Sequence, residues 1–283
     1  MRPKFSLVMS TINRTQQLVR FLEHLDRQTY REFELIIVDQ NDDDRLRPII
    51  SDYKHSFCII HTHSEKGASH GRNRGMEKIS GELVAFPDDD CWYAENLLER
   101  VCELFAVQTE VDIITGRTID SGGRSSLGKF DMRAGNITQR NVFKRGNTNT
   151  VFIRRAVAER ISFDESLGVG AGTKWGSGED PDYLLQALAA GFKLYYYPDL
   201  TVYHEEPVIE YNEAAINRGY SYALGMGRVF KKHRYPLDFV FVKLFYQVGG
   251  MIVALARMDM QRVKYHRAVF KGRWEGWKSP WEQ

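Results

Sequence analysis

Short apolar segments alternate with segments of mixed character over residues 4–115. The apolar segments cover residues 4–9, 34–38, 57–61, 83–86 and 111–115, and their length and composition predict strands. Residues 14–27, 69–79 and 94–107 predict helices, the first with Leu18, Phe21, Leu22 and Leu25 on one face. Because strands that alternate with helices form βαβ units, we expect an α/β fold with a mainly parallel sheet flanked by helices.

The second half of the chain is less regular. It predicts a strand over 148–153, a helix over 181–190, and short strands over 193–197 and 201–203. From Pro207 to Gly272 the pattern is helical. We therefore expect an α/β domain over residues 1–206 and a helical C-terminal extension over residues 207–283.

The composition is that of a soluble globular protein, with 43% hydrophobic and 27% charged residues in 283. Cys58, Cys91 and Cys102 are odd in number and fit no metal-ligand spacing, so we expect reduced thiols and a cytoplasmic protein. Residues 1–4 lead straight into the first predicted strand without the apolar segment of a signal peptide.

Charge is distributed unevenly, although the net charge is only +2. Residues 228–273 contain eleven Lys and Arg and two Asp, which gives +9 and leaves −7 for the rest of the chain. A basic segment on an acidic body indicates an anionic partner. We expect that partner to be an anionic membrane surface and expect no nucleic acid.

Three consecutive carboxylates, Asp88, Asp89 and Asp90, follow the predicted strand over 83–86. Three adjacent like charges repel one another unless a cation or solvent relieves them. Hard divalent cations prefer carboxylate oxygens, and ligands of open α/β sheets bind outside the carboxyl ends of the strands. The cluster predicts a Mn²⁺ or Mg²⁺ ion that holds a diphosphate, with a solvated acidic turn as the alternative.

Four polar clusters follow predicted strands, over residues 10–14, 39–42, 66–75 and 88–90. Their order resembles the nucleotide-sugar-binding half of family 2 glycosyltransferases, which have the GT-A fold. Residues 176–182 resemble that family's E-D-x-D segment, and Tyr203-His204 resembles its downstream histidine. The resemblance covers residues 4–205. The matching residues before the acidic cluster are Thr11, Asn13, Arg14, Val38, Asp39, Gly67, Arg72, Asn73 and Gly75.

The resemblance implies a GT-A catalytic domain over 1–206, with a nucleotide-sugar-binding half over 1–118 and an acceptor half over 119–206. It implies an inverting, metal-dependent transferase that moves a sugar from a nucleotide-diphosphate sugar, with UDP as the first expectation. The acceptor would be a glycan or a lipid-linked hydroxyl in cell-surface polysaccharide synthesis. Departures at Asn41, Gly71, Cys91 and Ala94 put the donor preference in doubt rather than the reaction class.

Site roles follow from the same resemblance. Asp90 would ligate the cation, which acts as a Lewis acid on the leaving diphosphate, and Asp88 would contact the cation or the ribose. His204 would be a third contact to the metal or diphosphate, with a surface or capping histidine as the alternative. The donor-binding residues would be Thr11, Asn13, Arg14, Asp39, Arg72, Asn73, Asp88 and Asp89.

The acceptor hydroxyl needs a carboxylate base, for which Asp180 is the first choice by resemblance, with Asp182 and Glu179 as fallbacks. The alternative is that Asp180 caps a helix that Pro181 begins. Residues 168–178 contain five glycines and predict a mobile lid next to this base. Lys174 and Trp175 lie in this lid, and Trp175 would either cover a sugar ring or pack beneath the loop.

The helical extension contains an apolar stretch over 239–256 with one Lys and one Gln inside it, which argues against a spanning helix. Its flanking basic residues, and Trp274, Trp277 and Trp281, favour peripheral association with the inner face of the plasma membrane. The alternative is packing on the rest of the chain or a homodimer interface. The flanking basic residues are Arg228, Lys231, Lys232, Arg234, Lys264, Arg267, Lys271 and Arg273.

Two other functions compete with the transferase. A sugar-nucleotide pyrophosphorylase would need a glycine-rich loop near the N-terminus, and residues 6–15 contain no glycine. A non-catalytic glycan-binding or scaffold protein with a transferase-like fold is the stronger alternative. The presence of Asp88, Asp90 and Asp180 argues against it.

Overall fold

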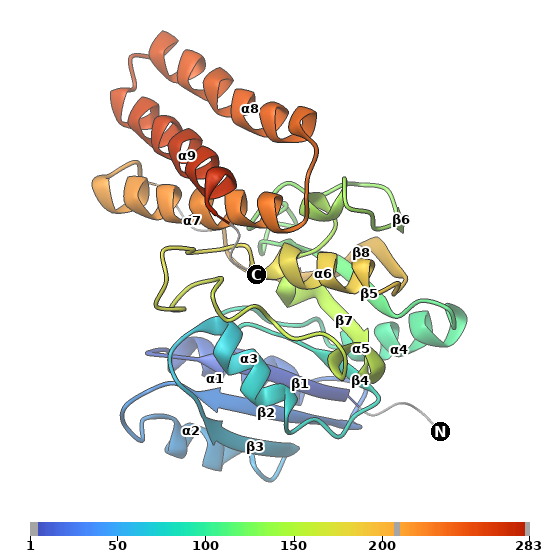
Figure 1. Cartoon of the computed structure of the whole chain (residues 1–283). Coiled ribbons are helices and arrows are strands. Elements are labelled where there is room, and N and C mark those ends of the chain that lie inside the picture. The colour runs from blue at the N-terminus through green and yellow to red at the C-terminus, as the bar shows by residue number, and fades with distance from the viewer. Residues whose placement is uncertain (1–4, 207–209, 281–283) are drawn as a thin grey trace. The chain divides into compact units, whose positions relative to one another are not determined.

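The computed structural model describes residues 5–206 and 210–280 (Figure 1). The chain divides into two compact units. The first consists of the described residues within 1–66, 70–163 and 183–207, and the second of those within 67–69, 164–182 and 208–283. The predicted boundary at 206/207 falls beside Pro207, which with Lys4 and Trp281 lies outside the described residues, and it stays a prediction.

The first unit contains an eight-stranded sheet with the order β3-β2-β1-β4-β7-β5-β8-β6. The pairs of β1 with β2, β1 with β4, β2 with β3 and β5 with β8 are parallel, whereas β7 and β6 pair antiparallel with their neighbours. This arrangement confirms the predicted mainly parallel sheet. The strands are β1 (Phe5–Thr11), β2 (Phe33–Asp39), β3 (Cys58–His63), β4 (Leu83–Ala85), β5 (Ile113–Ile119), β6 (Gly135–Asn136), β7 (Val151–Arg154) and β8 (Leu194–Tyr203).

Helices pack on the sheet because each presents apolar side chains at helical spacing. The buried faces of α1 (Gln16–Asp26), α2 (Leu46–Tyr53) and α4 (Leu97–Val107) join Leu7, Met9 and Ile37 in one hydrophobic core. On the other face of the sheet, α3 (Ala68–Met76) lies directly against β1. A Cβ at Gly75 would lie 2.3 Å from Val8 Cγ1. Glycine is therefore required there by close packing.

The structure differs from the sequence prediction in several places, and β6, the short helix α5 (Arg155–Ala158) and the 3₁₀ turn over 142–144 were not predicted. The helix α2 was not predicted, although Leu46, Ile49, Ile50 and Tyr53 have helical spacing. Residues 148–150 form a 3₁₀ turn, and the strand β7 begins only at Val151. The two short strands predicted over 193–203 are one strand, β8, whose register with β5 shifts beside Gly116. The helix α5 and the 3₁₀ turn over 142–144 complete the described elements of this part.

The second unit contains the helices α7 (Glu213–Lys232), α8 (Leu237–Ala256) and α9 (Met260–Lys278), which confirms the predicted C-terminal helices. Glycines allow α7 and α9 to approach closely. A Cβ at Gly276 would lie 2.0 Å from Leu224 O, and one at Gly227 would lie 2.2 Å from Arg273 O. The helix α6 (Glu179–Ala189) has residues 179–182 in this unit and residues 183–189 in the first.

Candidate active site

The carboxyl ends of the parallel strands bring the predicted donor-binding residues of the first unit to one edge of the sheet. Thr11 at the end of β1 is the register partner of Asp39 at the end of β2, and Asp39 is the partner of His63 at the end of β3. Ligands of open α/β sheets bind at this edge. The sequence prediction of a polar edge therefore agrees with the strand register.

The loop after β1 is held by the loop after β2 through two asparagines. Asn13 has a φ of +58°, in the left-handed region that Asn tolerates better than most residues. Its backbone N–H donates to Asn41 Oδ1 at 2.7 Å, and Asn41 Nδ2 donates to Asp39 Oδ1 at 2.7 Å. Asn41, the departure from the family pattern, therefore links Asp39 to the Thr11–Arg14 turn.

Asp89 is the buried member of the acidic cluster. Thr11 Oγ1 donates to Asp89 Oδ2 at 2.5 Å, and Arg14 Nη1 donates to Asp89 Oδ1 at 2.6 Å. Burial raises the pKa of Asp89 to about 6, although the contacts of Thr11 and Arg14 oppose this shift. Both oxygens of Asp89 contact Thr11 or Arg14 and so anchor the turn after β1, and the predicted donor contact of Asp89 stays a prediction.

Asp90 lies between two basic partners, Arg14 and His204. The backbones of Trp92 and Tyr203 exchange two hydrogen bonds, of 2.9 and 3.0 Å, which bring the end of β8 beside the acidic cluster. His204 Nε2 lies 3.3 Å from Asp90 Oδ1, and Arg14 is ion-paired with Asp90 Oδ2. The structure therefore brings together Asp90 and His204, two of the three predicted metal contacts.

These contacts shift the ionisation of both groups. Burial by itself would raise the pKa of Asp90, but His204 and Arg14 outweigh it and the pKa lies below its usual value. Burial would lower the pKa of His204, but the hydrogen bond to Asp90 outweighs it and the pKa lies above its usual value. Both shifts have the same cause, which is the favourable pairing of a carboxylate with a cation.

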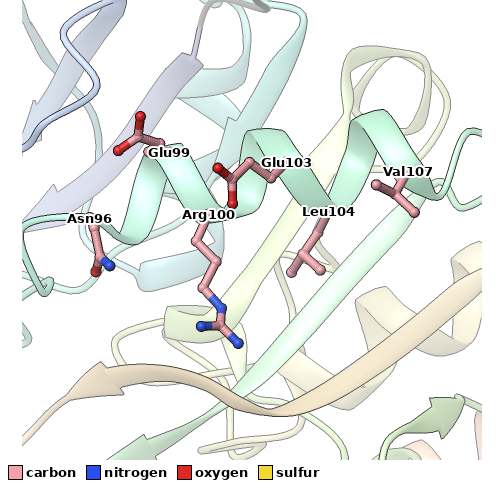
Figure 2. A pocket seen from close by; sticks show the side chains of 6 residues that line it. All are labelled: Asn96, Glu99, Arg100, Glu103, Leu104 and Val107. Atoms are coloured by element: carbon pink, nitrogen blue, oxygen red, sulfur yellow. The ribbon is translucent and has the colours of Figure 1, made fainter.

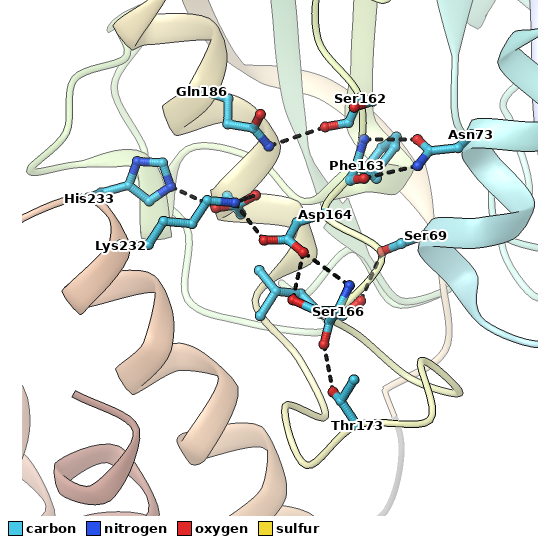
Figure 3. Close-up of polar contacts among 12 residues, drawn as sticks. Ser69, Asn73, Ser162, Phe163, Asp164, Ser166, Thr173, Gln186, Lys232 and His233 are labelled. Carbon is cyan, nitrogen blue, oxygen red and sulfur yellow. Dashed lines mark hydrogen bonds and ion pairs between the residues drawn. The ribbon is translucent and has the colours of Figure 1, made fainter. Parts of the chain in front are cut away.

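Arg72 and Asn73 are adjacent on α3 but make different contacts. Arg72 Nη2 donates to Asp88 Oδ1 at 2.9 Å, which places a guanidinium beside the acidic cluster. Asn73 pairs with the backbone of Phe163, donating from Nδ2 and accepting at Oδ1, both at 2.9 Å (Figure 3). The amide of Asn73 thus fastens the chain at Phe163, and its predicted donor contact stays a prediction.

Two histidines at the end of β3 complete this edge and were missed from the sequence. His61 Nε2 lies 3.0 Å from Asp39 Oδ2, and Asp39 is 1% exposed. Asp39, His61 and His63 form a group that could hold a metal ion. Their possible ligand atoms all lie within 4.8 Å of one another, and no other such group occurs among the described residues. The signal was present, since residues at i and i+2 of a strand face the same side.

In the second unit the acidic segment begins the helix α6. The helix starts at Glu179, so Gly178 is the capping residue, Asp180 lies in the first turn, and the predicted helix cap at Asp180 is wrong by two residues. Three carboxylates in a first turn are favoured by the helix dipole. Asp182 is fully buried, pairs with Lys232 and lies 2.7 Å from His233 Nε2, and its predicted role as a fallback base stays a prediction. Glu179 lies against Gly168.

The glycine-rich segment over 168–178 contacts α7 at its C-terminal end. Gly176 N–H donates to Ser221 O at 3.3 Å, and a Cβ at Gly225 would lie 2.0 Å from Ser177 O. Trp175 lies between the cations of Lys174 and Arg228, at 4.6 and 5.2 Å from the ring centroid. The predicted lid is thus fixed to α7 over its last residues, and Trp175 already has partners there.

A surface hollow of about 420 Å³ lies elsewhere in the first unit. Its lining residues come from α4 and the residue before it (Figure 2). None of the predicted donor, metal or base residues lines it, so it does not belong to the candidate site. The lining residues are Asn96, Glu99, Arg100, Glu103, Leu104 and Val107.

A mainly parallel sheet with acidic and basic side chains at its carboxyl edge is the architecture of the GT-A class. Residues 6–166, more than half of the chain, match the family described as Glycosyl transferase family 2. The chain belongs to this family. The predicted family and the predicted GT-A fold are therefore confirmed.

Relatives and solved structures agree with this assignment. The chain is 27% identical over 187 residues to glycosyltransferase AglE of Haloferax volcanii, and 25% identical over 212 residues to amylovoran biosynthesis glycosyltransferase AmsB of Erwinia amylovora. These matches cover 61% and 67% of this chain, but only 60% and 65% of the relatives' own length.

Two solved structures share the fold at low sequence identity. S. aureus TarS 1-349 in complex with UDP-GlcNAc has a TM-score of 0.61 and 16% identity, with 95% of this chain and 92% of that one covered. The mannosyltransferase PcManGT of Pyrobaculum calidifontis, in complex with GDP-Man and Mn²⁺, has a TM-score of 0.62 and 15% identity, with 97% and 88% covered.

Proposed function

We propose that this chain transfers a sugar, with inversion, from a nucleotide-diphosphate sugar to a hydroxyl of a glycan or lipid-linked acceptor in cell-surface polysaccharide synthesis. The observation that carries the proposal is the gathering of Asp88, Asp90, Arg14, Arg72 and His204 at the carboxyl edge of the sheet. The family assignment and the relative AmsB, which is named for amylovoran biosynthesis, support the same reaction class.

The residues at this edge fit a divalent cation. Asp90 has basic partners at both oxygens, Arg14 and the imidazole of His204, and Asp88 and Asp89 add negative charge beside it. Carboxylate oxygens with one imidazole suit Mn²⁺ or Mg²⁺. Asp88, Asp90 and His204 would hold the ion, and when bound it would neutralise the charge that develops on the diphosphate.

The chain's own cations would share this task. Arg14 and Arg72 hold guanidinium groups beside the acidic cluster, and guanidinium groups form paired hydrogen bonds with phosphate oxygens. Asp39 would orient the nucleobase or ribose, since Asn41 and His61 already fix both of its oxygens. UDP is the first expectation for the donor, and GDP the second, because structures of this fold contain one or the other.

The acceptor hydroxyl must lose a proton as it attacks, and Asp180 would take it. Asp180 lies in the first turn of a regular helix, so its backbone position is fixed. A single carboxylate base, with no second nucleophile, implies one displacement and inversion at the anomeric carbon. NMR of the product's anomeric configuration, compared with that of the donor, measures this stereochemistry directly.

Calorimetry with UDP, GDP and dTDP, each with and without Mn²⁺, tests the donor site. We expect one nucleotide to bind only with Mn²⁺, and its affinity to fall at least about tenfold in Asp90→Ala. Asp52→Ala, an exposed carboxylate on α2, is the matched control and should bind as the wild type does. If no nucleotide binds under either condition, the transferase proposal fails and the non-catalytic scaffold becomes the better explanation.

We also propose that α8 lies on an anionic membrane surface. Among the described helices, α8 is the one long and apolar enough, by length and composition, to cross a membrane. Only a stripe of it is buried, namely Val240, Leu244, Gln247 and Ala254. Outside this stripe its exposed side chains are mainly apolar, and exposed Arg257, Lys264 and Arg267 lie beyond its end. This combination favours an interfacial helix.

Not every basic residue predicted to meet lipid is available for it. Lys232 is ion-paired with Asp164 and Asp182. Arg273 donates to Lys243 O, and burial lowers its pKa to about 10. Arg228 contacts Trp175 and the backbone of Pro280. The cytoplasmic, peripheral location therefore rests on the exposed basic residues and on the apolar surface of α8.

A further inference from the structure

Asp182 is a carboxylate that the chain buries completely within the second unit. Its Oδ2 lies 2.8 Å from Lys232 Nζ, and its Oδ1 lies 2.7 Å from His233 Nε2. Lys232 is the last residue of α7, and His233 follows it. Burying a carboxylate is costly unless both oxygens find partners. The end of α7 supplies both partners.

Lys232 also binds Asp164, at the other end of the glycine-rich segment. Its Nζ lies 2.7 Å from Asp164 Oδ2, while Ser166 donates its N–H and Oγ–H to Asp164 Oδ1 at 3.0 and 2.6 Å. One ammonium group thus joins Asp164 to Asp182. The segment between these two residues contains Trp175, Glu179 and Asp180, so Lys232 closes it into a loop.

A second set of contacts packs the loop between Asp164 and Asp182 against α7. Gly178 has a φ of +106°, and a Cβ there would lie 2.7 Å from Val229 Cγ2. Asp182 N–H donates to Gly178 O at 3.0 Å, which is the first helical hydrogen bond of α6. The first turn of α6 is therefore held by backbone contacts at Gly178 and by ion pairs at Asp182.

We propose that Lys232 and His233 are positioning residues of the transferase, because they fix the first turn of α6 and with it Asp180. This inference rests on the proposed function of Asp180 as the base. Buried ion pairs are often no more stabilising than apolar residues of the same shape. Their value here is geometric: a base displaced by about 1 Å can lower the rate about 100-fold.

Lys232→Met tests the inference, because it keeps the length of the side chain and removes its charge. We expect kcat to fall about 100-fold, while the affinity for the nucleotide diphosphate stays within about twofold of wild type. Lys78→Met, an exposed lysine in the first unit, is the matched control and should keep the wild-type kcat. All rates are measured well below the melting temperature of each variant.

His233→Gln and His233→Phe separate positioning from packing. Gln can still donate a hydrogen bond to Asp182, so the kcat of His233→Gln should stay within about threefold of wild type. Phe cannot donate one, so the kcat of His233→Phe should fall at least about tenfold. The variant Asp164→Asn, Asp182→Asn and Lys232→Met removes all three charges of these ion pairs together, and it guards against a fold that fails only because one charge is left unpaired. It should still show the low kcat.

The outcomes separate the two levels of the proposal. If the wild type neither binds nucleotide nor transfers sugar, the proposed function fails. If the wild type is active, and Lys232→Met lowers only the melting temperature and keeps the wild-type kcat, the ion pairs are structural and the positioning role is wrong. Loss of kcat with donor affinity retained supports it.

Discussion

Ionised side chains in both units are paired with residues far away in the sequence. Arg14 pairs with Asp89 and Asp90, and Lys232 pairs with Asp164 and Asp182. Charged groups taken out of water need such partners. At the scale of single residues, these pairs fix the loops that carry the proposed donor and base residues, since each joins two loops or a loop and a helix.

The pKa of Asp164 leads to a prediction on acid stability. Burial would raise this pKa, but hydrogen bonds from Lys232 and Ser166 outweigh it, and the pKa lies below its usual value of 3.8. Since the folded pKa is the lower one, the ionised group stabilises the fold above pH 3.8, and this contribution is lost as the pH falls through the folded pKa.

Asp164→Asn should therefore lower the free energy of unfolding at pH 7 by about 1–3 kcal/mol. It should also flatten the loss of stability below about pH 4. Urea unfolding between pH 3 and pH 7 measures both effects. Asp44→Asn, an exposed carboxylate, serves as the control. Equal pH profiles for Asp164→Asn and the wild type would contradict the assignment.

Sequence reasoning found the residues at strand ends and missed their partners. Asp39, Asp88 and Asp90 follow apolar strands, which is a local signal. His61 and His63 gave an equally local signal, because alternate residues of a strand face the same side. The pairing of Asp182 with Lys232 spans 50 residues without any local pattern, so only the tertiary structure could show it.

At the scale of elements, the packing of α7 on α9 depends on glycine. A Cβ at Gly276 would lie 2.0 Å from Leu224 O, a backbone atom that cannot move without displacing α7. Gly249 on α8 has no neighbour within 4 Å of the same position. Substitution of Gly276 thus tests the effect of close helix packing on stability, whereas substitution of Gly249 tests the effect of helix propensity alone.

Gly276→Ala should destabilise the protein by about 1–3 kcal/mol, because the added methyl group overpacks the contact. Gly249→Ala should instead stabilise it by about 0.5–1 kcal/mol, because alanine loses less backbone entropy in a helix than glycine. Thermal unfolding of both variants, compared with the wild type, shows whether each substitution raises or lowers the stability. A gain of stability in Gly276→Ala would show that the two helices do not pack as described.

Elements with strong periodicity were predicted well, and those with mixed signals were not. The helix α1 was found because Leu18, Phe21, Leu22 and Leu25 all face the core. The helix α2 was missed because Pro48 interrupts its pattern, although proline is tolerated in a first turn. The strand β8 was split in two because Pro198 stands within it, and only the shifted register opposite Gly116 shows how it continues.

At the scale of the whole molecule, the apolar surface of α8 and the basic residues near it predict binding to anionic vesicles. Flotation with phosphatidylglycerol vesicles should recover the wild type, whereas phosphatidylcholine vesicles should recover much less. Phe245→Glu on the exposed face of α8 should weaken flotation about tenfold or more.

Val107→Glu is the matched control, because Val107 is 80% exposed on α4. It should float as the wild type does. Should Phe245→Glu float normally and change the molecular mass in solution instead, the face would be an interface between two copies of this chain, and the membrane proposal would be wrong.

The family was predictable from the sequence, because short motifs over residues 4–205 stand in the family's order. The division into two units was not, since it follows contacts rather than sequence order. In the sequence, residues 164–182 stand between two segments of the sheet-containing unit. Their contacts nevertheless place them in the same unit as the described part of residues 208–283. Charge patterning indicated an anionic partner for the basic segment, whereas the structure shows that part of this charge neutralises Asp164 and Asp182.

The ion pairs of Lys232 also bear on the order in which this protein becomes active during synthesis. The residues proposed to bind the donor have left the ribosome by His204, whereas Lys232 and His233 emerge later. A nascent chain can therefore complete the sheet and its donor edge before the first turn of α6 is held in place. On the proposed roles, a chain that ends before Lys232 would bind the nucleotide sugar at the donor edge but would lack the contacts that hold Asp180 for the transfer step.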